Sequence, residues 1–321
     1  MRRTAPAVVL LVAACGSGMG GAATTGAPAT EAATEAATAA TPAQVGAFPV
    51  TVEADNGAVE VESRPARIVS LSATATEMLF EIGAGPQVAA VDDRSNHPSQ
   101  APMTDLSGMT PNLEAILSYE PDLVVIAFDP GGLIAGLGAV GVPVLSFGAA
   151  TTLDGALRQM EALGAAAGAS ERAALAVERM EAGLREAVAA VGTAGKGVTY
   201  YHEIDSTFYT ADSSTFVGRI YGLFGMVNIA DGADPDGAAS GFPQLSGEHI
   251  VTADPDMVFL ANAAYGESAE TVAARPGWSA MKAVREGDIV ELDSDVASRW
   301  GPRVVELAQA VAVALNERGD G

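Results

Sequence analysis

Residues 113–127 have the sequence LEAILSYEPDLVVIA, and residues 247–261 have the sequence GEHIVTADPDMVFLA. The two segments match at one constant offset of 134 residues, which separates Glu114 from Glu248 and Pro121 from Pro255. In each segment a short helical stretch is followed by Pro-Asp and by a run of apolar residues that is typical of a buried parallel strand. A repeat at one offset indicates a duplicated unit, so we expect two lobes of related structure.

Strands and helices alternate on both sides of each repeat. Around the first repeat, strands are expected at 68–71, 88–91, 122–127 and 142–146, with helices at 76–82, 113–118 and 133–140. Around the second, strands are expected at 198–202, 257–260 and 289–292, with helices at 215–224, 278–284 and 304–315. Continuous Val, Ile and Leu strands between helices predict parallel sheets covered on both faces. The fold class is therefore α/β, with two Rossmann-like lobes.

The segment between the lobes has a helical composition. Leu153 to Val191 contains no proline and is rich in Ala, Glu, Arg and Leu, with Gly164 and Gly168 as expected interruptions. A helix of roughly 30 residues would be about 45 Å long, which is too long for a crossover within one sheet. We therefore predict an N-terminal lobe at 47–150, a long rigid backbone helix at 151–196 and a C-terminal lobe at 197–321.

The N-terminus has the features of an export signal. Arg2 and Arg3 precede a short apolar run, and Val12-Ala13-Ala14-Cys15 resembles a bacterial lipobox. We predict a signal peptide at 1–15, lipidation of Cys15 and a disordered Gly/Ala/Thr linker at 16–46. The protein is then expected on the outer face of the cytoplasmic membrane, held by its lipid anchor.

The composition excludes several classes of function. Forty Asp and Glu residues against 17 Lys and Arg give a net charge of −23, which repels nucleic acid, so no nucleic-acid partner is expected. The chain has no Gly-x-Ser-x-Gly elbow, no P-loop and no Gly-x-Gly-x-x-Gly after a strand, so we expect no enzymatic activity, no catalytic residues and no cofactor. The three histidines, His97, His202 and His249, do not have the spacing of a metal site. Joint ligation of a metal or haem iron by His97 and His202 stays open.

Glu114 and Glu248 occupy equivalent positions in the repeat. Each is expected in the first turn of a helix, after Asn112 or Ser246 as the N-cap. An acidic residue there stabilises the helix dipole by about 0.3–1 kcal/mol, and this alone could explain both residues. Alternatively, two related lobes would present the pair as fixed anions to a positively charged partner.

Several motifs together resemble a known family. They are Arg67-Ile-Val-Ser-Leu-Ser72, Thr76-Glu77, Pro111-Asn112-Leu113-Glu114, the two Pro-Asp segments and Ser298-Arg299-Trp300-Gly301-Pro302-Arg303. Their order and spacing, from about Ala47 to Leu315, resemble the cobalamin and ferric-siderophore binding proteins of ABC importers. The resemblance implies a monomer with a ligand cleft between its lobes, and an ABC permease with its ATPase as partners. It also implies that Glu114 and Glu248 form salt bridges to permease arginines.

The resemblance further implies which residues contact the ligand: Arg94, His97, Met109, Tyr201, Tyr209, Arg299 and Trp300. Arg94 and Gly108 stand where aromatic residues would flank a corrinoid. Arg94 and Arg299 could instead bind carboxylate or catecholate oxygens of an iron chelate, or could merely pair with Asp92 or Asp93. We therefore expect a ferric siderophore as ligand, with cobalamin or haem as the alternative. An extracellular sensor or interaction module without transport is the alternative from another class.

Overall fold

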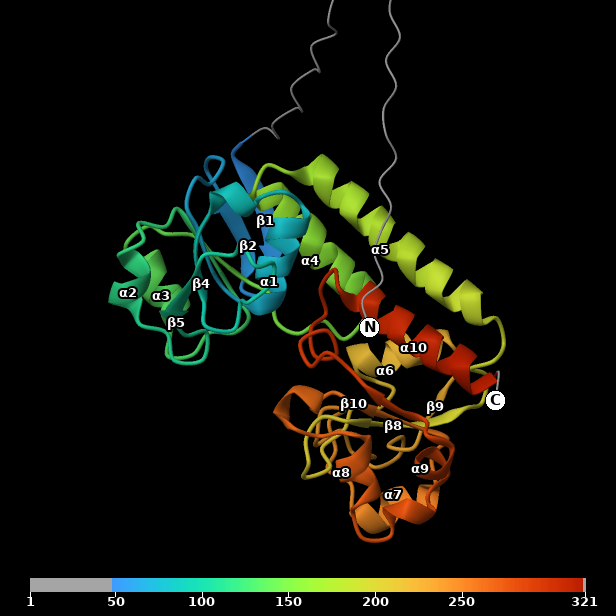
Figure 1. Ribbon diagram of the computed structural model, residues 1–321. Helices are drawn as coiled ribbons and strands as arrows, with labels where there is room; N and C mark the ends of the chain where they lie inside the picture. Colours follow the sequence, from blue (N-terminus) through green and yellow to red (C-terminus); the bar gives the residue numbers. More distant parts are fainter. Residues whose placement is uncertain (1–47, 320–321) are drawn as a thin grey trace, which may run out of the picture. The chain divides into compact units, whose positions relative to one another are not determined.

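The computed structural model describes residues 48–319, which belong to one compact unit (Figure 1). The predicted signal peptide, Cys15 and the predicted linker lie outside the described residues. None of the described helices is long and apolar enough to cross a membrane.

The N-terminal lobe contains a five-stranded parallel sheet with the strand order β5-β4-β3-β6-β7. Its strands are β3 (Ile68–Leu71), β4 (Val88–Asp92), β5 (Met103–Leu106), β6 (Leu123–Ile126) and β7 (Val144–Ser146). Three helices accompany them, α1 (Ala73–Glu81), α2 (Leu113–Leu117) and α3 (Leu133–Gly138), with a one-turn η1 (Gly85–Gln87). An antiparallel hairpin precedes the sheet, formed by β1 (Val50–Ala54) and β2 (Gly57–Val61). Within this five-stranded sheet, the edge strand β5 is the one strand that was not predicted from the sequence.

The C-terminal lobe contains a four-stranded parallel sheet with the order β11-β10-β8-β9. Its strands are β8 (Thr199–Glu203), β9 (Val227–Asn228), β10 (Met257–Leu260) and β11 (Ile289–Glu291). Its helices are α6 (Phe216–Leu223), α7 (Gly247–Ala253), α8 (Ala269–Ala273) and α9 (Lys282–Glu286), with short turns η2 (Ala263–Tyr265) and η3 (Trp278–Ala280). The predicted helix at 278–284 is therefore two pieces, η3 and α9.

The sequence repeat has a structural role in both lobes. β6 and β10 follow α2 and α7 at the predicted offset, and each lies beside the first strand of its sheet. The Asp122 carboxylate accepts hydrogen bonds from the backbone N–H groups of Ala66 and Arg67, just before β3. The Asp256 carboxylate accepts one from the N–H of Thr199, at the start of β8. The Pro-Asp motif thus fixes the start of the neighbouring strand in each sheet.

The segment between the lobes is not one helix, and that prediction was wrong. It forms α4 (Leu153–Ala166) and α5 (Ser170–Val191), which pack against each other. Gly168 lies between them at φ +64°, a left-handed conformation that glycine adopts without strain, and it ends the first helix. Gly164, by contrast, lies within α4, where an added Cβ would come within 2.4 Å of the Ala173 Cβ on α5.

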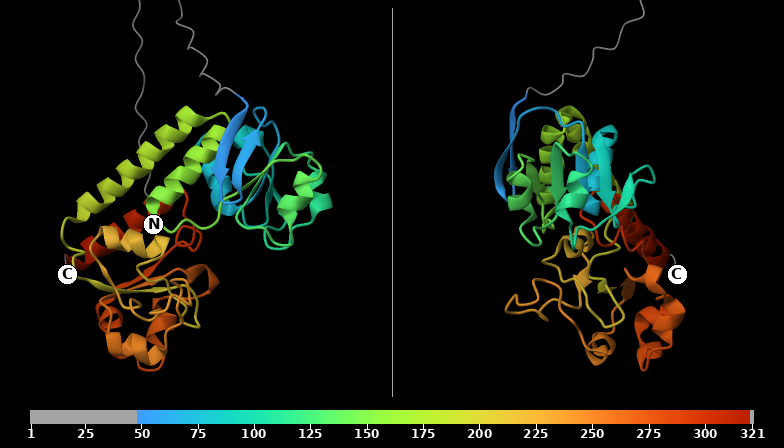
Figure 2. Two further views of the ribbon diagram at one scale, coloured as in Figure 1. Left: turned by 180° about the vertical axis from the view of Figure 1, so that it is seen from behind. Right: turned by 90° about the vertical axis from the view of Figure 1, so that its left-hand side faces the viewer.

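Three helices rather than one form the spine between the lobes. α4 contacts α1 and β1 of the N-terminal lobe, α5 contacts both α4 and α10 (Val304–Gly319), and α10 contacts α6 of the C-terminal lobe (Figures 1 and 2). One continuous hydrophobic core runs through all of them, from Leu79 through Met180 to Phe259. Separate, smaller cores fill the outer face of each sheet. The spine therefore stabilises both lobes at once, because its burial is shared between them.

β8 shows how alternation along a strand distributes polar groups. Tyr200 packs against Tyr221 on the spine side, whereas Tyr201 packs against Trp278 on the outer side. His202 returns to the spine side, where its Nδ1 lies 3.0 Å from the Tyr221 hydroxyl oxygen. Burial lowers the pKa of His202 from 6.5 to about 4, so the imidazole is neutral at physiological pH.

The buried imidazole predicts a component of acid instability. Its folded-state pKa is depressed, so the stability it contributes is present above pH 6.5 and is lost as the pH falls toward 4. The loss is about 3 kcal/mol of unfolding free energy. His202→Gln removes the titration, so its unfolding free energy should fall less steeply over this pH range in urea titrations. His249→Gln, which changes an exposed histidine, is the control. Equal slopes for His202→Gln and the wild type would contradict the assignment.

Candidate functional site

A cavity of about 540 Å³, partly open to solvent, lies where the two lobes meet. Its walls follow the carboxyl ends of strands from both sheets, which is where open α/β sheets bind ligands. Ala149, Ala150 and Thr151 follow β7 in the N-terminal lobe. The remaining lining residues belong to the C-terminal lobe and to the segment before α10: His202, Ile204, Ala211, Ser214, Thr215, Phe216, Val217, Ser240, Phe242, Ala261, Tyr265, Ser294, Asp295, Ala297, Ser298 and Trp300.

The lining is mostly apolar and contains no lysine or arginine. Asp295 is its one carboxylate, and this group is already paired with Arg299 at 2.8 Å and with the Asn96 amide at 2.7 Å. His202 is neutral for the reason given above. The cavity therefore presents apolar surface and uncharged hydrogen-bonding groups to a ligand. A larger hollow of about 960 Å³ lies between α1, α5 and the start of α10, but it is wider open to solvent.

Aromatic side chains gather at this cavity. Phe242 and Tyr265 are 47% and 79% exposed, so much of each ring is accessible to solvent. Trp300 is half-buried and donates its indole N–H to Gln159 Oε1 at 2.8 Å. Of the residues that the sequence predicts to contact a ligand, Trp300 lines this cavity, whereas Phe242 and Tyr265 line it without having been predicted. Tyr265 lies five residues after the end of β10, and the rule that ligands bind beyond the carboxyl ends of strands could have identified it.

Two predicted ligand residues are buried elsewhere, and these predictions were wrong. Tyr201 is fully buried in the outer core of the C-terminal lobe, because the alternation of β8 turns it away from the cavity. Arg299 is 8% exposed and directs its guanidinium into a cluster of protein groups. Gly108, expected to stand in place of a ligand-flanking aromatic residue, has no room for a side chain, since a Cβ would lie 2.6 Å from the Leu71 carbonyl oxygen.

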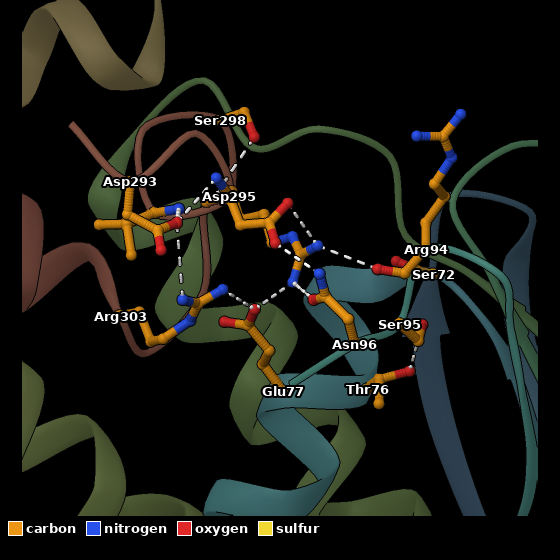
Figure 3. Close-up of polar contacts among 12 residues, drawn as sticks. Ser72, Thr76, Glu77, Arg94, Ser95, Asn96, Asp293, Asp295, Ser298 and Arg303 are labelled. Atoms are coloured by element: carbon orange, nitrogen blue, oxygen red, sulfur yellow. Dashed lines mark hydrogen bonds and ion pairs between the residues drawn. The ribbon is translucent and has the colours of Figure 1, made fainter. Parts of the chain in front are cut away.

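The other predicted ligand residues lie outside this cavity. Arg94, Met109 and Tyr209 are exposed on loops, and the Arg94 guanidinium points away from Asn96 (Figure 3). His97 borders the separate hollow beside α1, so it does not meet His202. Within residues 48–319, no group of three or more His, Cys, Asp or Glu side chains is arranged to hold a metal ion.

A buried ion cluster lies behind the cavity wall. The Glu77 carboxylate, on α1, is 3% exposed, and its Oε1 accepts hydrogen bonds from Arg299 at 2.6 Å and from Arg303 at 2.7 Å. Arg299 also donates to the Arg94 carbonyl oxygen at 2.9 Å and to Asn96 Oδ1 at 3.1 Å. Figure 3 shows the Glu77 carboxylate directed toward Arg303, with Asn96 and Asp295 beside it. Arg299 does not form the pair with Asp92 or Asp93 that the sequence left open as an alternative.

Glu114 and Glu248 have the local structure that the sequence predicts. Asn112 caps α2 and Ser246 caps α7, and both glutamates are exposed in the first turn of their helix. α2 and α7 cover the outer core of their respective lobes, on the face of each sheet away from the spine. Among residues 48–319, neither glutamate has a cation within ion-pair distance. The structure therefore places a matched pair of free carboxylates on the two lobes.

A family model and individual known proteins match this chain over most of its length. A family model for periplasmic binding proteins matches residues 68–296. The chain is 31% identical over 284 residues to the cobalamin-binding protein of Halobacterium salinarum, covering 84% of this chain and 74% of that protein. It is 28% identical over 278 residues to the ABC transporter substrate-binding lipoprotein YvrC of Bacillus subtilis, covering 84% and 86%.

Solved structures share the fold. The heme-binding protein RhuT from Roseiflexus sp. RS-1 has a TM-score of 0.69 at 23% identity and covers 79% of this chain and 99% of its own. The vitamin B12 binding protein BtuF of Vibrio cholerae has a TM-score of 0.64 at 23% identity, covering 80% and 99%. These matches confirm the predicted two-lobe α/β fold and the resemblance carried by the sequence motifs. The chain belongs to the periplasmic binding protein family, whose members are extracytoplasmic, non-catalytic substrate-binding components that work with an ABC permease and its ATPase.

Proposed function

We propose that this protein captures a corrinoid of the cobalamin class in the cavity between its lobes and delivers it to an ABC permease. The observation that carries the proposal is the chemistry of the cavity: apolar walls, aromatic side chains at Phe242, Tyr265 and Trp300, and no cation in the lining. A corrinoid presents a broad apolar macrocycle edged with neutral amide groups. Aromatic side chains pack on such a surface, and the serine and threonine hydroxyls of the lining suit its amides.

An anionic ferric siderophore, which the sequence favoured, fits this cavity less well. Its charge would have to leave water for an apolar space without a compensating cation, and a buried unpaired charge is costly. Arg299 was expected to supply that cation, but its guanidinium is already ion-paired with Glu77 and Asp295. The cobalamin-binding relative from Halobacterium salinarum, at 31% identity, also supports the corrinoid. Haem is the alternative within the same cavity, with His202 as the one imidazole in its lining.

The ligand class is tested by direct binding. We expect cyanocobalamin to bind more tightly than hemin or a ferric triscatecholate in isothermal titration calorimetry. Phe242→Ala combined with Tyr265→Ala should weaken cyanocobalamin binding by about 1–3 kcal/mol, because two aromatic contacts are lost. Leu175→Ala, which removes an exposed apolar side chain from α5, is the control and should have no effect. Tighter binding of the ferric triscatecholate or of hemin would reject the corrinoid.

We further propose that Glu114 and Glu248 bind arginines of the permease, and that the protein acts as a monomer in this complex. Exposed carboxylates without a cation of their own are available for such pairs. Reversing both, by Glu114→Arg with Glu248→Arg, should abolish ligand uptake by cells while the affinity for ligand stays unchanged. Glu171→Arg is the matched control, since Glu171 is also an exposed first-turn glutamate but lies on the spine helix α5. Loss of ligand affinity in the double variant would contradict docking as their role.

The lipid anchor at Cys15 is likewise a proposal. It rests on the lipobox at residues 12–15 and on the lipoprotein name of the Bacillus subtilis relative. Cys15→Ala should release the protein from the membrane fraction into the medium or periplasm, since the acylated thiol is lost. Ser17→Ala, a neighbouring change that keeps the cysteine, should leave the protein in the membrane fraction. Retention of the Cys15→Ala protein on membranes would refute the anchor.

A further inference from the structure

One wall of the cavity is formed by residues 294–300, a segment between β11 and α10. It contributes Ser294, Asp295, Ala297, Ser298 and Trp300 to the lining. The segment follows the last strand of the C-terminal sheet, so it belongs to the C-terminal lobe by chain connectivity. Its polar contacts, however, are made with the N-terminal side of the molecule.

Side-chain hydrogen bonds tie this wall to the N-terminal side of the molecule. Arg299 binds Glu77 on α1, Asp295 accepts from Asn96 at 2.7 Å, and Trp300 donates to Gln159 on α4. Among residues 48–319, every side-chain hydrogen bond that leaves the segment 293–303 ends on a residue between 77 and 159. The other side-chain hydrogen bonds of the segment join two of its own residues, such as those from the backbone N–H groups of Asp295 and Val296 to Asp293.

Glu77 is the central group of these ties. One buried carboxylate oxygen accepts from two guanidinium groups, so a single side chain neutralises Arg303 and helps to neutralise Arg299. Both arginines are nearly buried, with 12% and 9% of their side chains exposed. Buried charges of this kind hold a fixed geometry, since a displaced guanidinium would lose its counter-charge without regaining water.

We infer that Glu77 is a positioning residue for ligand binding, which holds the 294–300 wall on the N-terminal lobe through Arg299. The opposite wall, with Ala211, Phe216 and Phe242, belongs to the C-terminal lobe. The width of the cavity then depends on the distance between the lobes. This inference rests on the proposed function only in taking this cavity as the ligand site.

Trp300 provides a direct readout of the wall. The chain has two tryptophans, and Trp278 is buried in the outer core of the C-terminal lobe. In a Trp278→Phe background, the fluorescence of the remaining Trp300 reports the wall alone. Glu77→Gln keeps the shape of the side chain but removes its charge. We expect it to increase acrylamide quenching of Trp300 and to weaken cyanocobalamin binding on the order of tenfold, the usual size of coupling between sites.

Glu81→Gln is the matched control. Glu81 is on the same helix and also pairs with an arginine, Arg179 at 2.7 Å, but the pair is exposed and does not touch the wall. Its quenching and its affinity should equal those of the background protein. Asn96→Ala removes the two hydrogen bonds between Asn96 and the wall but leaves Arg299 paired with Glu77 and Asp295. It should shift both readouts in the direction of Glu77→Gln, by less.

The outcomes separate a positioning role from a merely structural one. A Glu77→Gln protein that melts at a lower temperature, yet keeps the Trp300 quenching and the affinity of the background, would overturn the inference. If Glu77→Gln does not fold, Asn96→Ala decides by the same two readouts. If the background protein fails to bind cyanocobalamin, the proposed ligand is wrong, and the quenching comparison still decides whether Glu77 holds the wall.

Discussion

The arrangement depends on one buried carboxylate shared by two arginines. Glu77 lies near the middle of α1, and its partners Arg299 and Arg303 flank the turn that leads into α10. The contact joins residues 222 positions apart in the chain. It holds the start of α10 against α1, and therefore holds the segment 294–300, which precedes α10, at the wall of the cavity. Replacing such a cluster with apolar groups could be neutral for stability, but it would remove the geometry that the charges specify.

The helical spine limits how far the two lobes can move apart. α4, α5 and α10 bury a continuous core with both sheets, so the lobes cannot separate widely without exposing apolar surface. Small movements of one lobe relative to the other remain compatible with this packing. Because the walls of the cavity are divided between the lobes, such movements would change its width. A rigid spine and a divided cavity therefore suit a receptor that holds its ligand until another protein acts on both lobes.

Much of the fold could be predicted from local sequence pattern, and the candidate site could not. The apolar runs of β6 and β10 and the caps Asn112 and Ser246 are encoded within a few residues, so the repeat could be found without a structure. β5 was missed because Met103-Thr-Asp-Leu106 has little apolar pattern and is held mainly by pairing with β4. Arg299 was assigned to the ligand because nothing near it in the sequence indicates Glu77 as its partner. Tyr201 was assigned there because the side of the sheet that a strand residue faces depends on how the strand packs. Phe242 lies on a loop and Tyr265 ends the short turn η2, and no sequence motif marks either position.

We propose that ligand binds between the C-terminal lobe and a wall held by the N-terminal lobe. Hydrogen–deuterium exchange of the whole chain, with and without saturating cyanocobalamin, tests it most directly. We expect slower exchange in the backbone around 149–151, 240–242, 263–266 and 294–300, with no change around 97–102 in the open hollow beside α1. Protection confined to 97–102 and the neighbouring turn of α5 would place the ligand in the open hollow and exclude the cavity between the lobes as its site.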